Sequence, residues 1–186
     1  RDYLAASDAD KAKVAEYLGT GFGGHAGKAS DFPMRDITLR EPITNPGKIL
    51  CIGLNYRKHA AEAGLPVPSY PLIFPRWPES HVAHGQPLMA PRESHQFDYE
   101  GELAVIIGKT ARRVSEADAL HYVGGYACYN EGSIRDWQMH TTQYVPGKNF
   151  YHSGSFGPCM LSADEVADPA DLVLETRLNG EVVQHE

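Results

Sequence analysis

Two glutamates separated by one residue are the pair of side chains in this sequence most suited to chemistry. Glu100 and Glu102 lie in the run 98–107, DYEGELAVII, whose apolar end is strongly β-forming. Residues i and i+2 of a strand share a face, so the two carboxylates are expected to project side by side. Like charges held that close resist burial unless a cation lies between them. The pair therefore indicates a site for a hard divalent ion such as Mg²⁺, with a solvated edge strand as the alternative.

A third acidic residue follows another apolar segment. Residues 123–130 alternate in the manner of a strand, and Glu131 comes directly after them, before Gly132. We expect a side chain at the end of such a strand to face a cavity. Glu131 is therefore the best candidate for a third ligand.

Two further groups have the chemistry of a catalytic site. His59 and Glu62 are three residues apart on an expected short helix, so they face the same way. A carboxylate beside an imidazole orients the ring and raises its basicity, which suits a base that activates water. Lys148, on an expected turn, could hold a substrate carboxylate. Each pattern also occurs on surfaces without any catalytic role.

Other patterns carry less weight. The G-x-G-x-x-G spacing in residues 19–24 follows an expected helix, whereas a dinucleotide loop follows a strand. His81 and His84 lie in a loop without a cysteine or a clear third ligand, so a surface pair is favoured over a zinc site. Arg135 and Asp136 are expected to pair with each other, either to brace the site or at a surface.

Composition excludes several classes of protein. Hydrophobic content of 42% and charged content of 22% over 186 residues are typical of a globular protein with a real core. The net charge of -7 argues against a nucleic-acid surface. No apolar stretch approaches the roughly 18 residues of a membrane span. The three scattered cysteines and the lack of a signal-peptide pattern favour reduced thiols and a cytoplasmic location.

The patterns predict a mainly β protein with short helices, an α+β fold. Strands are expected over residues 37–42, 48–53, 72–74, 98–107 and 123–130, with a hairpin over 172–183 around Asn179-Gly180. Helices are expected over residues 1–19, 55–63 and 115–120, and residues 131–152 are expected to be irregular.

Two parts are expected along the chain. Residues 1–45 form a small N-terminal helix-and-strand segment, and residues 46–186 form the catalytic domain. The return strand of the last hairpin has only begun when the sequence stops. The C-terminal part of that domain is therefore expected to be absent from this chain.

Taken together, these segments resemble the fumarylacetoacetate hydrolase family, in its acylpyruvate hydrolase-like branch, over residues ~46–186. The matching pieces are Gly53-Leu54-Asn55-Tyr56 with His59 and Glu62, the run 98–103, Gly125-Tyr126 through Asn130-Glu131 to Arg135-Asp136-Trp137-Gln138, Gly147-Lys148, and Phe156-Gly157-Pro158.

The resemblance implies a β roll made by a folded-over sheet, usually a homodimer, that binds Mg²⁺ or Mn²⁺ and a 2-oxo acid. It implies that Glu100, Glu102 and Glu131 bind the metal. It also assigns catalysis to His59, Glu62 and Lys148, and substrate binding to Arg76, Arg135, Gln138 and Lys148. Two positions depart from the family pattern, because relatives usually have Asp at Glu131 and many have Lys at Arg76.

The expected function is hydrolysis of a C–C bond in a 2,4-dioxo acid of the acylpyruvate type, in the catabolism of aromatic compounds or sugar acids. His59, oriented by Glu62, would activate water, and a pyruvate-like enolate would form against the metal. Two alternatives stay open. One is a metal-dependent decarboxylase, isomerase or hydratase of 2-oxo-enoic acids, and the other is a non-catalytic oligomeric relative.

Overall fold

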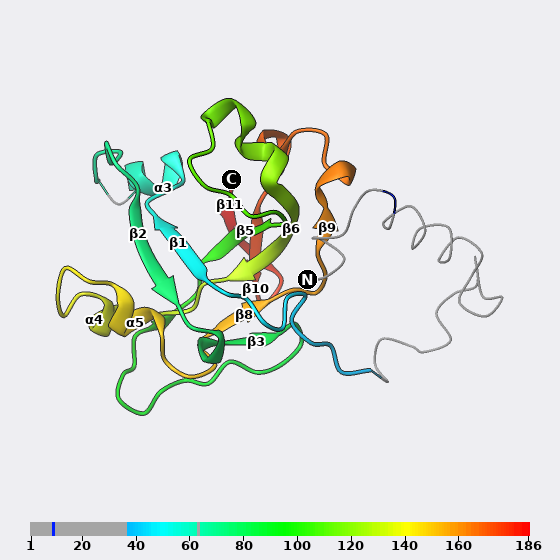
Figure 1. Ribbon diagram of the computed structural model, residues 1–186. Coiled ribbons are helices and arrows are strands. Elements are labelled where there is room, and N and C mark those ends of the chain that lie inside the picture. The colour runs from blue at the N-terminus through cyan, green and yellow to red at the C-terminus, as the bar shows by residue number, and fades with distance from the viewer. Residues whose placement is uncertain (1–8, 10–36, 63) are drawn as a thin grey trace.

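The computed structural model describes residue 9, residues 37–62 and residues 64–186 (Figure 1). The expected helix over residues 1–19 and the glycine-rich spacing in residues 19–24 lie outside this part of the chain, apart from residue 9. The described part is mainly β with short helices, as predicted. It contains one five-stranded sheet and three two-stranded sheets.

The five-stranded sheet has β5 at one edge, and it follows the order β3-β8-β6-β5, with β9 also paired to β6. β5 and β6 are antiparallel over most of their length, and Gly101 pairs with Asn130. The five strands are β3 (His81–Ala83), β5 (Gly101–Ile107), β6 (Val123–Asn130), β8 (Gly154–Phe156) and β9 (Leu161–Ser162). This pairing brings the start of β5 next to the end of β6.

Three short antiparallel pairs surround this sheet. They are β1 (Ile49–Gly53) with β2 (Leu72–Arg76), β4 (Phe97–Asp98) with β7 (Ser133–Ile134), and β10 (Glu175–Leu178) with β11 (Glu181–His185). The β10–β11 turn is Asn179-Gly180, and both residues have positive φ, as the sequence predicts for such a hairpin.

The helices are all short. The α-helices are α3 (Arg57–Glu62), α4 (Arg135–Gln138) and α5 (Val145–Lys148), and the 3-10 helices are η3 (Pro78–Ser80), η4 (Glu116–Tyr122), η5 (Ala163–Glu165) and η6 (Pro169–Asp171). Gly64 follows α3 with φ +64°, the left-handed conformation of a C-terminal cap.

Several expected elements differ in the structure. Residues 37–42 form no strand, because Pro42 lacks an N–H and no described strand pairs with this segment. The expected strand 98–107 is broken, because β4 pairs with β7 while β5 pairs with β6, and the chain crosses between two sheets. The expected helix 115–120 is the 3-10 helix η4, and the segment expected to be irregular contains β7, α4 and α5.

Among the described residues, the core contains as many polar side chains as apolar ones. Buried apolar residues from the sheets include Phe74, Val82, Ala83, Tyr126, Ala127, Ile134 and Phe156. Three charged residues, Arg76, Glu131 and Lys148, are each only 2% exposed. Charged side chains are almost never buried unless they are paired, so these three mark the place where the fold holds a charged site.

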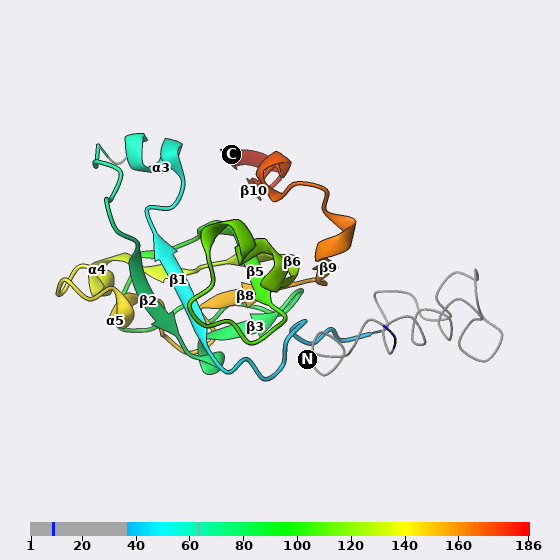
Figure 2. The same ribbon diagram turned by 45° about the horizontal axis from the view of Figure 1, so that its top comes forward.

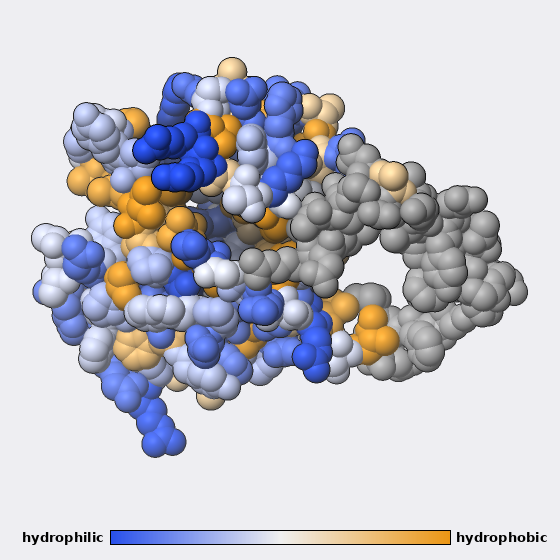
Figure 3. Space-filling view, viewed as in Figure 1, coloured by the Kyte–Doolittle hydropathy of each residue, from blue (hydrophilic) through white to orange (hydrophobic). Residues whose placement is uncertain are grey.

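The β1–β2 pair leaves one of its faces exposed. Leu50 on β1 and Ile73 on β2 are 59% and 60% exposed. Apolar side chains accordingly gather on the surface over these two strands in Figure 3. The opposite face of the same pair carries Phe74 and Arg76, and it packs toward the buried charges.

Candidate metal centre

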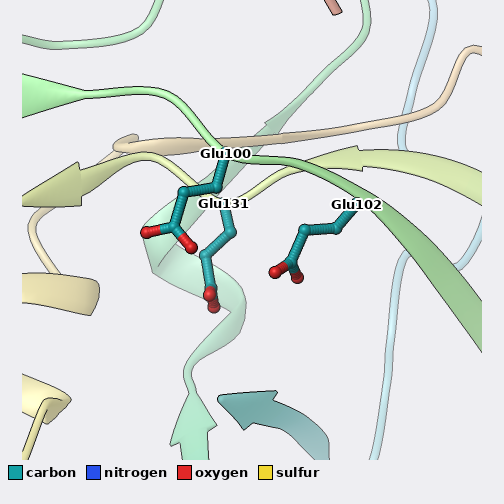
Figure 4. A group of neighbouring side chains, drawn as sticks. All are labelled: Glu100, Glu102 and Glu131. Carbon is teal, nitrogen blue, oxygen red and sulfur yellow. The ribbon is translucent and has the colours of Figure 1, made fainter. Parts of the chain in front are cut away.

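Three glutamates converge where β5 begins and β6 ends. Glu100 directly precedes β5, Glu102 is its second residue, and Glu131 directly follows β6. One carboxylate oxygen from each lies within 4.8 Å of the other two. Figure 4 shows the three side chains pointing into the same space. The structure thus brings together the three residues that the sequence nominated as metal ligands.

Lys148 is placed by α5 between two of these carboxylates. Its Nζ donates hydrogen bonds to Oε1 of Glu100 at 2.7 Å and to Oε2 of Glu131 at 3.0 Å. The ammonium is therefore fully paired inside the protein. Burial alone would raise the pKa of Glu100, but the charges of Lys148 and Arg135 hold that pKa below its usual value.

Arg135, the first residue of α4, braces the same carboxylate from the other side. Its Nη1 donates to Oε1 of Glu100 at 2.8 Å and to Oε1 of Gln138 at 3.0 Å. Its Nη2 lies 2.7 Å from Oδ2 of Asp98. Pairing of Arg135 with its neighbour Asp136 was expected and is wrong, because Asp136 instead accepts a hydrogen bond from Oγ of Ser94 at 2.6 Å.

Glu102 has no comparable support. Within the described residues it has no hydrogen bond and no ion pair. Burial, followed by the charges of Glu131 and Glu100, raises the pKa of Glu102 to about 8. Oε1 of Glu131 is also buried and accepts no hydrogen bond from the described residues. The carboxylate of Glu102 and one oxygen of Glu131 thus lack a hydrogen-bond donor among the described residues.

A divalent cation would balance the excess negative charge of this cluster. The cluster contains four carboxylates, those of Asp98, Glu100, Glu102 and Glu131, against three cations, those of Arg76, Arg135 and Lys148. One negative charge is left over when all of them are ionised. The donors are carboxylate oxygens, which hard ions such as Mg²⁺ and Mn²⁺ prefer.

Arg76 supports the cluster from behind. Its guanidinium donates to Oγ and the backbone carbonyl of Ser80, to the carbonyl of Gly132 and to Oγ of Ser153. Its Nη1 also lies 3.9 Å from Oε1 of Glu131. Arg76 does not line the cavity described below, and its contacts lie behind Glu131, so its expected contact with a substrate stays a prediction.

A cavity of about 190 Å³ opens onto the cluster. His59, Arg135, Gln138 and Lys148 line it together with the three glutamates. The rest of its wall is largely apolar or aromatic: Leu54, Tyr56, Leu65, Phe74, Met139 and Tyr144, with Gly53 and Asn55. His59 is exposed on α3, while the side chain of Glu62 lies outside the described part, so their expected pairing stays a prediction.

The patterns that the sequence set aside have structural roles. His81 is buried against Tyr129 and Phe156, whereas His84 is exposed. Among the described residues, the three glutamates are the only cluster suited to a metal ion. The hydroxyl of Ser153 accepts a hydrogen bond from Arg76. The three cysteines form no disulfide bond, as expected.

Some supporting residues were missed by sequence reasoning. Asp98 pairs with Arg135, and Ser133 donates from Oγ to Oε1 of Glu100 at 2.6 Å. The hydroxyl of Tyr56 accepts from the backbone N–H of Leu103. Asp98 and Ser133 each lie two residues from a candidate ligand, on β4 and β7, which pair with each other, and this spacing was the available signal.

Residues 48–186 match the family model described as Fumarylacetoacetate (FAA) hydrolase C-terminal. This match covers well over half of the chain, and the chain belongs to that family, which confirms the family predicted from the sequence.

The relatives give the family resemblance more detail. The chain is 41% identical over 152 residues to the mitochondrial oxaloacetate tautomerase fahd2 of Xenopus laevis, covering 81% of this chain and 48% of that protein. A solved fumarylacetoacetate hydrolase from Exiguobacterium antarcticum is 35% identical, with a TM-score of 0.69 over 79% of this chain and 53% of that one.

A more distant neighbour shares the fold. Maleylpyruvate hydrolase from Sphingobium sp., solved with manganese (II) ion and pyruvate, has a TM-score of 0.76 at 24% identity, covering 100% of this chain and 61% of that one. The predicted family fold is therefore confirmed. The chain spans about half the length of the curated relatives it matches.

The expected cytoplasmic location is not confirmed. The Xenopus laevis relative is named as mitochondrial. Among the helices that the structure describes, none has the length and apolar character needed to cross a membrane.

Proposed function

We propose that this chain forms part of a divalent-metal-dependent enzyme that interconverts the keto and enol forms of a 2-oxo acid. The observation that carries the proposal is the convergence of Glu100, Glu102 and Glu131 with uncompensated negative charge, in a cavity that His59 also lines. The name of the Xenopus laevis relative, an oxaloacetate tautomerase, supports this reaction over others.

The three glutamates would hold the ion. When bound, the ion supplies positive charge that stabilises the negative charge developing on the 2-oxo group and its neighbouring carboxylate. The ammonium of Lys148 contacts both Glu100 and Glu131, and its charge favours the ionised form of Glu100 by lowering the pKa of that carboxyl. Glu102, whose pKa is raised, would lose its proton when the ion binds.

Arg135 and Gln138 are placed to orient the substrate. The side chain of Arg135 is 33% exposed, and both residues line the cavity beside Glu100. A guanidinium at this position can hold a substrate carboxylate through its exposed edge while its other donors stay on Asp98 and Glu100. Leu54, Phe74 and Tyr144 give the cavity an apolar wall that limits the access of water.

His59 is the group that would move the proton. It would take the proton from the carbon next to the carbonyl and return it to the enol oxygen, so that one C–H bond breaks and one O–H bond forms. The reaction needs one acid–base group and no attacking water. Among the described residues that line the cavity, His59 is the only histidine, and it is neither a candidate ligand nor paired with one.

A direct assay follows the ultraviolet absorbance of an enol 2-oxo acid such as enol-oxaloacetate. We expect the chain to accelerate ketonisation only with Mg²⁺ or Mn²⁺ present, and a chelator should abolish the effect. Equal rates with and without the metal would refute the proposal.

Hydrolysis of an acylpyruvate-type C–C bond is the second candidate. It is favoured by the placement of His59 and Glu62 three residues apart on α3, where a dyad could activate water. Release of pyruvate with an equimolar carboxylic acid would identify hydrolysis, and release of CO₂ would identify decarboxylation. A non-catalytic relative would bind oxalate, an enolate mimic, no better with metal than without it. The homodimer and the division at residues 1–45 and 46–186 stay predictions.

A further inference from the structure

The C-terminal hairpin β10–β11 contacts the backbone between two of the candidate ligands. Gly101 separates Glu100 from Glu102 and lies on β5, at the edge of the five-stranded sheet. A peptide group on an edge strand has hydrogen-bonding groups that no neighbouring strand satisfies. At Gly101 another side chain satisfies them.

Gln184 on β11 satisfies both groups of Gly101. Its Oε1 accepts from the N–H of Gly101 at 3.0 Å, and its Nε2 donates to the carbonyl of Gly101 at 2.8 Å. Its primary amide therefore acts as a partner strand would, over a single residue. The hydroxyl of Thr176, opposite on β10, donates to the same Oε1 at 3.0 Å and fixes the direction of the amide.

The packing at this contact also explains why position 101 is occupied by glycine. A Cβ added to Gly101 would collide with Oγ1 of Thr176 and press on Oε1 of Gln184. The hairpin thus takes the space that the absence of a side chain leaves. Glu100 and Glu102 extend from the two neighbouring residues, so a shift of the Gly101 peptide changes the distance between their carboxylates.

The hairpin also contacts the helix that carries His59. Nζ of Lys58 donates to the carbonyl of His185 at 3.2 Å and lies 3.7 Å from Oε2 of Glu186. Figure 2 shows α3 and the end of the chain close together. One short element therefore touches both the strand that carries two ligands and the helix that carries the candidate proton-transfer group.

We propose that Gln184 is a positioning residue of the metal centre: its amide, oriented by Thr176, holds the Gly101 peptide so that Glu100 and Glu102 converge on one ion. This inference rests on the metal binding in the proposed function. Partners that orient ligands typically contribute about 10- to 100-fold to metal affinity.

The test compares Gln184→Met with Gln86→Met. Methionine keeps the length of the side chain and removes both hydrogen bonds to Gly101. Gln86 is an exposed control, and its side chain makes a single long hydrogen bond among the described residues, 3.4 Å to the carbonyl of Leu39. We measure Mn²⁺ affinity by electron paramagnetic resonance, at a temperature where circular dichroism shows each variant folded. The expected result is a loss of at least about tenfold for Gln184→Met and no change for Gln86→Met.

A second readout does not require metal. Hydrogen exchange of the Gly101 amide should become faster in metal-free Gln184→Met than in the wild type. Thr176→Val removes only the orienting hydroxyl, so it should weaken Mn²⁺ binding in the same direction by less, and it serves if Gln184→Met does not fold. Unchanged affinity or unchanged exchange at Gly101 would overturn the inference. Failure of the wild type to bind Mn²⁺ would instead refute the proposed function, and the exchange comparison would still test the contact.

Discussion

Glu100 and Glu102 lie on either side of one glycine, yet only Glu100 has a cationic partner, with Nζ of Lys148 at 2.7 Å from its Oε1. The pKa of Glu100 is held below its usual value, whereas that of Glu102 is raised to about 8. The difference arises from neighbours rather than from position in the sequence. The paired cations lie against Glu100, so Glu102 is the carboxylate that a bound cation would stabilise most under the proposed function.

The contribution of Glu102 to the stability of the metal-free protein should fall as the pH rises from about 4.5 to about 8, against an opposite contribution from His81, whose pKa burial lowers. Glu102 holds its proton more tightly in the folded state, so ionising it in this range costs folding free energy. The effect should reach a few kcal/mol, since each pKa unit corresponds to about 1.4 kcal/mol. Urea unfolding with a chelator present, at pH 5 and pH 8.5, measures it.

The control for this prediction is Glu102→Gln. The stabilising contribution of Glu100, whose pKa is lowered, is lost only below about pH 4.5 and does not enter the window. The variant should therefore lose most of the slope and be at least as stable as the wild type at pH 8.5. A variant that keeps the full slope would assign the effect to another group.

Binding of Mg²⁺ should strengthen with pH over the same range. A carboxylate must lose its proton to bind a metal, so below pH 8 binding releases the proton of Glu102. The affinity should rise up to about tenfold per pH unit and level off above pH 8. Calorimetric titrations in two buffers of different ionisation enthalpy measure both the affinity and the proton release. Binding without proton release at pH 6.5 would contradict the prediction.

Lys148→Met should destabilise the metal-free protein by about 3 kcal/mol. The ammonium is buried between Glu100 and Glu131, and removing it leaves two buried carboxylates without their partner. Urea unfolding at pH 7.5 gives the change. Lys109→Met, at an exposed lysine after β5, is the matched control and should change stability by less than about 0.5 kcal/mol. Equal stability of the two variants would show that the buried pairs contribute nothing.

His59→Gln should lower turnover by about 10²- to 10⁴-fold while leaving metal affinity unchanged. His59 lines the cavity but is not among the clustered carboxylates, so proton transfer and ion binding should separate. His84→Gln, at an exposed histidine of the described chain, is the control and should keep full activity. A His59→Gln variant with wild-type turnover would remove the histidine from the mechanism.

The sequence predicted the parts of this site that depend on local geometry. The limits of β6 followed from its alternation, and the turn at Asn179-Gly180 followed from the need for positive φ. Convergence of Glu100 and Glu102 was predicted from their spacing. The two carboxylates do converge in the structure, although Glu100 lies one residue before β5 begins.

What could not be predicted depends on contacts between distant segments. The position of Lys148 between Glu100 and Glu131 was not predicted, while its expected contact with a substrate stays a prediction, since Lys148 also lines the cavity. Arg76 reaches Gly132 across 56 positions, a contact that no local period encodes. The contact between Gln184 and Gly101 likewise forms only because the last hairpin folds back onto β5.

The central claim is that three glutamates bind one divalent ion, and the most direct test is anomalous scattering from crystals soaked in Mn²⁺. The account predicts a single strong anomalous peak among the carboxylates of Glu100, Glu102 and Glu131, which Glu102→Gln weakens or removes. Crystals of the wild type with no peak at this position, or with the ion bound elsewhere, would contradict it.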